Sequence, residues 1–361
     1  MRDQEPRRHR IHEKAGPFLR ASEPPLVSTP GPSRKSLRIV VTDAIISRFE
    51  DQLKHDGGAH HWDMAAAWTP DRQLDALASA DVVVCSSLNP QQAAAAARLE
   101  LVHVTGAGYD RISFPGLPPG AVVANTFHHA RPIAEHVLMT TLMLSRNVLA
   151  ADRAVRGGSW KTIATDPDVP FHPTLGGMTM GLVGMGSIGA EVARMAGVLG
   201  MDVRAVRRNP DGSIPDGVAL SWVGGNHQLP ELLAASDVVV VTVPLDASTR
   251  GMIGAAELAA MKPTSLLINV ARGPVVDQHA LFDALQSQRI AGAGIDVWWG
   301  SPADGVVPPA ELPFASLPNT VLTPHHSGHA RITFERRAAD IAANIRRLTE
   351  GQALFNVVPR D

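Results

Sequence analysis

The sequence predicts an α/β protein with two domains, each built around a parallel sheet. The chain has 361 residues, more than a single hydrophobic core usually serves. From Leu37 onward, short β-rich runs alternate with helical stretches, and a second alternating series begins at Met178. The apolar run at 238–241 lacks polar alternation, as expected of parallel strands that helices cover on both faces.

The first series predicts an N-terminal sheet. We expect its strands at 37–41, 62–68, 81–86, 101–105 and 121–125, and its helices at 45–54, 73–80 and 91–100. A long helix should follow from about Pro132 to Asn147, because the fixed φ of proline suits a first helical turn.

The second series predicts a second sheet. Its five expected strands are 178–183, 202–206, 237–243, 265–270 and 292–296. A helix is expected over 190–199. The last helix, about 331–349, carries Ile341, Ile345 and Leu348 at helical spacing on one face, with Arg and Asp on the other.

Composition excludes several classes of protein. A formal net charge of -2 gives no electrostatic case for binding nucleic acid, so a small-molecule partner is expected. No apolar run approaches the roughly 20 residues of a membrane-spanning helix, which favours a cytoplasmic protein. The single cysteine, Cys85, excludes an intrachain disulfide and a cysteine metal cage. Residues 1–36 hold eight Lys/Arg, four Asp/Glu and six prolines, and we expect a disordered extension there.

A glycine-rich segment at 184–189 follows the apolar strand at 180–183 and precedes a helical stretch. A lone GxGxxG motif is weak evidence. In this setting, however, backbone N–H groups at a helix N-terminus can stabilise a pyrophosphate, so a dinucleotide cofactor is expected. The residues expected to contact it are Gly184, Gly186, Ser187, Ile188 and Gly189.

The end of the next strand indicates which dinucleotide binds. NAD enzymes usually place a carboxylate there for the ribose 2′-hydroxyl, whereas this chain has Arg207 and Arg208. Paired guanidinium groups can hold a 2′-phosphate through charge-assisted hydrogen bonds. The sequence therefore favours NADP. The alternative is NAD with two solvated loop arginines.

Several further segments carry a family resemblance. They are 105–110 (TGAGYD), 134–136 (AEH), 243–245 (VPL), 268–273 (INVARG), 294–297 (GIDV) and 322–325 (LTPH), in this order around the glycine loop. With these landmarks, residues 37–358 resemble the D-isomer-specific 2-hydroxyacid dehydrogenases. The resemblance implies hydride transfer between NAD(P)H and a small 2-keto or D-2-hydroxy acid, of the glyoxylate or hydroxypyruvate kind.

The resemblance also implies a domain arrangement. Two Rossmann-like or flavodoxin-like domains are expected. The dinucleotide-binding domain, 133–324, would be inserted into a substrate domain made of 37–132 and 325–361. The active site would lie in the cleft between them, and members of this family are typically homodimers.

Reduction of a 2-keto acid requires a cation for the carboxylate and carbonyl, an acid for the developing alkoxide, and a hydride donor. The resemblance assigns the first role to Arg272 and the second to His325, whose imidazole titrates near neutral pH. Backbone N–H groups of Ala107 and Gly108 would receive the substrate carboxylate, unless the segment is a plain turn. Further implied contacts are His129 to the substrate, and Val243, Pro244, Ala271, Asp296 and Gly328 to the cofactor. For Asp296, a structural cap would look the same.

Two features near His325 need separate treatment. His325 and His329 have i, i+4 spacing, but Pro324 and Gly328 argue against the helix that a metal pair would use, so no metal is expected. Family members with an acidic relay carry glutamate five residues after the aspartate that corresponds to Asp296. This chain has Ser301 at that position. The usual His–Glu pair is therefore absent, although Asp304 or Glu311 could reach the site from the intervening loop.

Two alternative functions stay open at this stage. Formate dehydrogenases also lack that glutamate, and their sequences are similar around Trp298 and at Ser327-Gly328. Against formate oxidation, His129 stands where they place a formate-binding asparagine, and Arg207 replaces their cofactor-selecting acid. The family also contains corepressors that use nucleotide binding to control assembly, but the retained Arg272 and His325 favour an enzyme.

Overall fold

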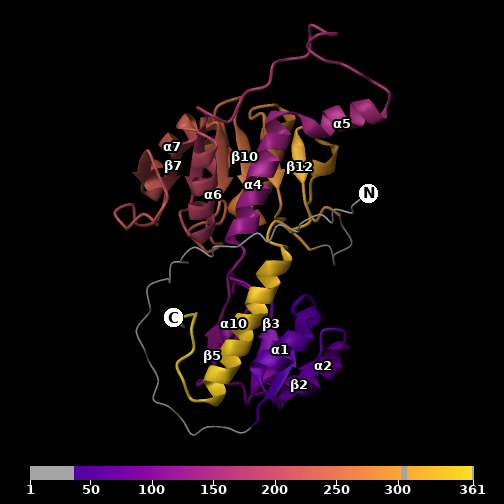
Figure 1. Ribbon diagram of the computed structural model, residues 1–361, viewed down its shortest axis with the longest axis vertical. Helices are drawn as coiled ribbons and strands as arrows, with labels where there is room; N and C mark the ends of the chain where they lie inside the picture. Colours follow the sequence, from indigo (N-terminus) through magenta and orange to yellow (C-terminus); the bar gives the residue numbers. More distant parts are fainter. Residues whose placement is uncertain (1–35, 302–306, 360–361) are drawn as a thin grey trace, which may run out of the picture.

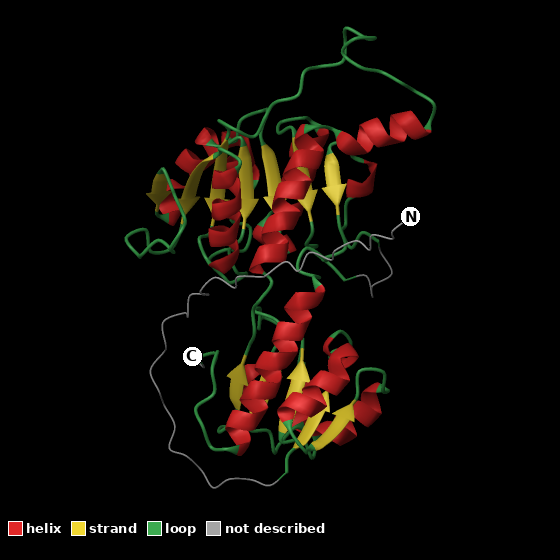
Figure 2. Ribbon diagram, in the orientation of Figure 1, coloured by secondary structure: helices red, strands yellow, loops and turns green. Residues whose placement is uncertain are grey.

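Two parallel sheets form the centres of two domains (Figures 1 and 2). The computed structural model describes residues 36–301 and 307–359. The extension predicted for 1–36 therefore lies outside the described residues except for Ser36, and so does the candidate relay acid Asp304.

The N-terminal sheet has the strand order β2-β1-β3-β4-β5, with every neighbouring pair parallel. This is the flavodoxin-like order. Its strands are β1 (Arg38–Val41), β2 (His61–Met64), β3 (Val82–Cys85), β4 (Leu101–Val104) and β5 (Val122–Ala124). Its helical segments are η1 (Ile46–Phe49), α1 (Glu50–Gly57), α2 (Pro70–Leu77), α3 (Pro90–Ala95), η2 (Phe114–Gly116) and the C-terminal α10 (Arg331–Thr349).

The second sheet has the order β12-β11-β10-β9-β6-β7-β8, again parallel throughout, which is a Rossmann order extended by one strand. Its strands are β6 (Thr179–Val183), β7 (Asp202–Val206), β8 (Trp222–Gly224), β9 (Val238–Val241), β10 (Leu266–Asn269), β11 (Gly292–Ile295) and β12 (Thr320–Leu322). The helical segments are α4 (Ala130–Ser145), α5 (Val148–Arg156), α6 (Ser187–Val198), η3 (Asn226–Gln228), α7 (Leu229–Ala235), α8 (Ala255–Ala260), η4 (Gly273–Val275), α9 (Gln278–Gln286) and η6 (Phe314–Ser316). The predicted fold class is confirmed.

Helices cover both faces of each sheet, as predicted from strands that lack alternating polar residues. All four residues of β9 are completely buried. They contribute to two apolar clusters on opposite faces of the larger sheet. On the smaller sheet, Ile341 and Ile345 of α10 pack against β1 in one of its two clusters. Figure 1 shows α10 returning to the N-terminal domain after the second sheet is complete.

Some predicted boundaries are wrong, for local reasons. The strand predicted over 62–68 ends at Met64, because Ala65–Trp68 closes a turn with a hydrogen bond of 3.0 Å. The long helix begins at Ala130 rather than Pro132, and it ends before Asn147, whose φ of 49° is left-handed. The sequence prediction missed β8 and β12, which have three residues each and lie at the two edges of their sheet.

The chain crosses between the domains twice, from β5 to α4 and from β12 to α10 (Figure 1). Residues 125–129 form the first crossing and 323–330 the second. The split that the resemblance implies at 132/133 and 324/325 falls at or beside these crossings and stays a prediction. His129 and His325 thus stand on the segments that join the domains.

Candidate active site

The glycine loop turns the chain from β6 into α6. Gly184 has a φ of 103°, and a Cβ atom there would lie 2.9 Å from Cγ1 of Val243. A Cβ atom on Gly189 would lie 2.5 Å from the Gly184 carbonyl oxygen, so glycine is needed for the helix to approach the turn. At Gly186, in contrast, a Cβ atom would meet nothing within 4 Å. The open side of this turn and the free N–H groups of the 12-residue α6 fit a pyrophosphate.

The predicted cofactor arginines follow β7, beside the glycine loop, but they make different contacts. Arg207 donates hydrogen bonds to the carbonyl oxygens of Pro210, Gly212 and Ser213, the first and last at 3.1 and 3.0 Å. Arg208 is 79% exposed in its side chain and pairs with Asp246 across 3.2 Å. Arg207 therefore holds its own loop, and Arg208 presents its charge at the surface.

The ends of β9 and β10 complete this edge of the sheet. Val243 lies against Gly184, and the exposed Pro244 accepts a 2.6 Å hydrogen bond from Thr249 at its carbonyl oxygen. The buried Ala271 accepts a 2.8 Å hydrogen bond from Nη1 of Arg272. These residues lie at the carboxyl edge of the sheet, where α/β domains bind their ligands.

Arg272 links the two domains. Its Nη2 donates to Oδ1 of Asp110 at 3.3 Å, so its guanidinium reaches the 106–110 turn of the N-terminal domain. A Cβ atom on Gly108 would overlap that guanidinium, so glycine lets the side chain of Arg272 lie directly against this turn. The carbonyl of Ala107 is fixed by Nδ2 of Asn125 at 2.8 Å. The predicted carboxylate-binding turn and the predicted cation thus lie in direct contact.

Asp296 fixes the loop that carries His325. Its carboxylate, 1% exposed, accepts hydrogen bonds from Thr323 Oγ1 (2.6 Å), His326 N (3.0 Å) and Ser327 N (3.1 Å). Burial opposes ionisation, but the bonds from Ser327, Thr323 and His326 hold the pKa of Asp296 below its usual value. These contacts are those of a structural cap, and the carboxamide-binding role stays a prediction.

His325 is held in an unusual environment. Its φ of 56° lies in the left-handed region, which non-glycine residues adopt at a cost that is common at functional sites. Partial removal of solvent lowers the pKa of its imidazole below the usual value. The charges of Arg272 and Arg111 act in the same direction, against an opposing effect of Asp296.

No carboxylate within the described residues forms a hydrogen bond with His325. Ser301 is exposed at the end of a described segment. The candidate relay acid Glu311 directs its carboxylate toward His279, at 3.8 Å. The predicted absence of a His–Glu pair stays a prediction, since Asp304 lies outside the described residues.

A second cation enters the site from α10. Arg337 donates from Nη2 to Nδ1 of His129 at 3.0 Å and from Nε to the Phe127 carbonyl at 2.9 Å. Burial, with the charges of Arg337 and Arg272, lowers the pKa of His129 to about 4, so this imidazole is neutral near pH 7. Gly328 packs against the β-carbon of the same histidine, because a Cβ atom there would lie 3.3 Å from Cβ of His129. The sequence prediction missed Arg337, because helical periodicity places it on the polar face of α10.

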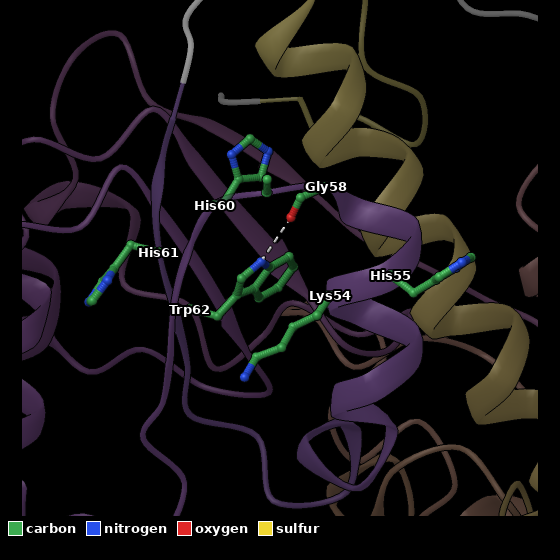
Figure 3. A pocket seen from close by; sticks show the side chains of 7 residues that line it. Lys54, His55, Gly58, His60, His61 and Trp62 are labelled. Atoms are coloured by element: carbon green, nitrogen blue, oxygen red, sulfur yellow. Dashed lines mark hydrogen bonds between the residues drawn. The ribbon is translucent and has the colours of Figure 1, made fainter.

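Two other features do not belong to this site. Phe314 is fully buried and stacks on Trp299 at 5.2 Å, so this pair packs the domain core. A hollow on the N-terminal domain is lined by Lys54, His55, Gly58, Ala59, His60, His61 and Trp62 (Figure 3). In Figure 3 its histidines point in different directions, and the described residues contain no group of three possible metal ligands.

Comparison with known proteins identifies the family. A family profile described as D-isomer specific 2-hydroxyacid dehydrogenase, NAD binding domain, matches residues 138–327. The chain belongs to this family. A glyoxylate reductase of Korarchaeum cryptofilum is 33% identical to this dehydrogenase over 332 residues, which cover 90% of this chain and 96% of the relative.

Further relatives support the same family assignment. A glycerate dehydrogenase of Methylorubrum extorquens is 30% identical over 295 residues, or 80% of this chain and 88% of the relative. The solved structure of a glyoxylate reductase from Paecilomyes thermophila is similar with a TM-score of 0.75 and 25% identity, covering 90% of this chain and 99% of that chain.

The predicted family and enzyme class are confirmed. The protein is an NAD(P)-dependent D-2-hydroxyacid dehydrogenase, which transfers a hydride between the nicotinamide cofactor and a 2-keto or 2-hydroxy acid. No helix among the described residues is long and apolar enough to cross a bilayer.

Proposed function

We propose that the enzyme reduces glyoxylate or hydroxypyruvate, with NADPH as the preferred donor, and that Arg272 and His325 carry the reaction. The observation that carries this proposal is the reach of Arg272 from the cofactor domain to Gly108 and Asp110. The relatives named glyoxylate reductase support the substrate class.

The site residues divide the chemistry. The Arg272 guanidinium binds the substrate carboxylate and polarises the keto oxygen. The N–H groups of Ala107 and Gly108 receive a carboxylate oxygen. A bound NADPH would supply the hydride for the keto carbon. As negative charge develops on the oxygen, protonated His325 donates its proton there, which completes the 2-hydroxy acid. In the reverse direction neutral His325 takes that proton back.

A substrate panel tests the proposal. We expect oxidation of NADPH with glyoxylate and hydroxypyruvate to give higher kcat/KM than with pyruvate or phenylpyruvate. NAD⁺ or NADP⁺ with formate tests the formate dehydrogenase alternative. Nucleotide binding without turnover of any of these substrates would contradict the proposal and favour a corepressor-like protein.

Cofactor choice is expected to depend on Arg208 and Asp246. The exposed guanidinium of Arg208 can hold a 2′-phosphate, while Asp246 competes for it and repels the phosphate. We expect Arg208→Ala to lower the ratio of kcat/KM for NADPH to that for NADH by about tenfold, roughly 1.4 kcal/mol. We expect Asp246→Asn to raise the same ratio. Steady-state kinetics with both cofactors measures each change.

Arg207 calls for a different variant. Because it holds three carbonyls of its loop, Arg207→Asp is expected to shift preference toward NADH together with a loss of loop order. Arg98→Ala is the matched control, since it removes an arginine that pairs with Asp81 in the other domain. A tenfold preference for NADH in the unmodified enzyme would contradict the proposed role of these arginines.

The enzyme is also proposed to be a homodimer. α5 and the segment after it project from the larger domain in Figure 1, and Trp160 and Phe171 on that segment are 75% and 84% exposed. Met139 and Leu142 are exposed apolar residues of α4, which precedes α5. Apolar surface of this kind is typical of an interface.

A charge on the projecting segment tests the dimer. We expect light scattering to give twice the chain mass for the unmodified protein and one chain mass for Trp160→Glu/Phe171→Glu, since buried carboxylates would oppose association. Ile332→Glu, at an exposed apolar position on α10 of the N-terminal domain, controls for a general effect of the substitution. A monomeric unmodified protein would contradict the proposed dimer.

We also propose the cytoplasmic location that was expected from the sequence, and cell fractionation tests it.

A further inference from the structure

The guanidinium of Arg337 is a cation in the proposed substrate site that forms no salt bridge with a described residue. No carboxylate within the described residues lies within ion-pairing distance of its guanidinium. Burial lowers its pKa to about 10, against the opposing charges of Asp43 and Asp340, so it stays protonated near pH 7. A partly buried, protonated guanidinium without a bound carboxylate is a ready partner for an anionic ligand.

The two nearby carboxylates are occupied by other groups. Asp340 accepts hydrogen bonds from Thr126 Oγ1 at 2.6 Å and from His128 Nε2 at 2.7 Å. Asp43 accepts a hydrogen bond of 2.7 Å from Thr105 Oγ1 through one carboxylate oxygen. Its other oxygen accepts from the backbone N–H of Ile46 at the start of η1. Both therefore support the walls of the site and leave Arg337 without a direct counter-ion.

Arg337 also presents unused donors. Its Nε and Nη2 contact the 127–129 segment, whereas Nη1 has no acceptor among the described residues and lies 3.9 Å from the Cβ position of Gly106. Neutral His129 accepts from Arg337 at Nδ1, so its Nε2 carries a proton. The pair therefore offers two donors beside the carboxylate-binding turn.

The two arginines flank one turn. Arg272 lies against Gly108 and Arg337 lies against Gly106, and two peptide units span at most about 7 Å. A 2-keto acid held by Arg272 would thus have a second cation within reach of its far end. Glyoxylate has no group there and leaves that cation unused.

We propose that Arg337 and His129 form a subsite for a second anionic group, so that the preferred substrates are 2-keto acids with a distal carboxylate or phosphate ester. This inference rests on the proposed function, because it assumes that Arg272 holds the 2-keto acid end. Within it, Arg337 sets specificity and takes no part in the transfer of hydride or proton.

Pairs of substrates of equal length test the subsite. Oxaloacetate is compared with 2-oxobutanoate, and 2-oxoglutarate with 2-oxopentanoate, while phosphohydroxypyruvate against hydroxypyruvate tests the phosphate ester. We expect the unmodified enzyme to prefer the anionic member of at least one pair by tenfold or more in kcat/KM. Arg337→Met should lower that ratio by about ten- to a hundredfold, the range for a charged hydrogen bond. Arg337→Lys should keep part of it.

Controls separate specificity from folding. Arg337→Met also removes the hydrogen bonds to Phe127 and His129, so it is expected to lower the melting temperature. Specificity is therefore measured as the ratio of kcat/KM between the anionic and the neutral member of a pair within one folded variant. Arg336→Met removes an exposed charge from the same helix and should leave every substrate ratio unchanged. An equal loss for anionic and neutral substrates, or no preference in the unmodified enzyme, would overturn the subsite while glyoxylate reduction still supports the proposed function. If no keto acid is reduced, the proposed function itself fails.

Discussion

Arg272→Ala is expected to lower kcat/KM for glyoxylate reduction by about a thousandfold or more, which corresponds to about 4 kcal/mol of transition-state stabilisation. The loss is expected to be large because, in the proposed mechanism, one guanidinium both binds the carboxylate and stabilises the charge that develops on the keto oxygen. Steady-state kinetics of NADPH oxidation measures it. Arg272→Lys should recover only part of the activity, because a point charge cannot replace the planar fork.

The contact between Arg272 and Asp110 provides the control. Arg272→Ala removes both the proposed catalytic cation and an ion pair between the domains, whereas Asp110→Asn removes the ion pair alone. This exposed pair is worth little by itself, so we expect Asp110→Asn to lose less than tenfold in kcat/KM. Near-native turnover of Arg272→Ala would exclude the residue from the mechanism. An equal loss in Asp110→Asn would show that domain alignment, not charge on the substrate, is its main contribution.

The sequence predicted the central elements of the fold and missed its edges. The strand at 202–206 and the helix at 331–349 were predicted with the observed bounds, because apolar runs and helical periodicity are strongest in elements that pack on both sides or along one full face. The edge strands β8 and β12 have only three residues each, too few for a periodic pattern. Asn147 ends α4 through a left-handed φ, which local sequence does not specify.

The candidate site was predicted as a set of residue types but not as a set of contacts. Arg207 and Arg208 are neighbours with the same chemistry, yet one is bound by carbonyls of its own loop and the other pairs with a residue 38 positions away. No sequence pattern predicts hydrogen bonds to backbone carbonyls or ion pairs with residues far apart in the chain. Arg337 was missed for a related reason. Periodicity separates the apolar face of α10 from its polar face, but it cannot tell that the start of this helix lies beside the crossing at 127–129.

His325→Asn is expected to reduce keto-acid reduction by about a hundred- to ten-thousandfold, the range for loss of a positioned proton donor. Asparagine keeps a polar side chain but supplies no acidic proton. In the proposed mechanism reduction uses protonated His325, so the rate should be present below the pKa of this imidazole and fall as pH rises through it. Since loss of solvent and the nearby Arg272 lower that pKa, the fall should begin below the ordinary imidazole value of about 6.5. Hydroxy-acid oxidation uses the neutral ring and should rise over the same interval.

Because Ser301 stands where relatives with an acidic relay have glutamate, the pH dependence of the rate tests the predicted absence of that relay. A serine can orient an imidazole but cannot neutralise its charge, whereas a carboxylate at that position would stabilise the protonated ring. We therefore expect Ser301→Glu to move the fall in kcat/KM for glyoxylate to higher pH. Asp304→Asn and Glu311→Gln should leave it in place, and for Glu311 the contact with His279 already supports this expectation. A downward shift in either variant would reveal a displaced relay acid and contradict the role given to Ser301.

Comparing formate oxidation with keto-acid reduction in His325→Asn distinguishes a loss of proton transfer from a general loss of the site. Oxidation of formate releases a hydride without any proton passing through an acid or base, so an enzyme that accepts formate should keep this activity in His325→Asn while keto-acid reduction is lost. That pattern would confine acid–base chemistry to the keto-acid reaction within one shared cleft. If both activities disappear together, the substitution has disturbed the loop that Asp296 holds through Thr323, His326 and Ser327. If keto-acid reduction survives, another group is the proton donor, and the depressed pKa of His325 has no part in the rate.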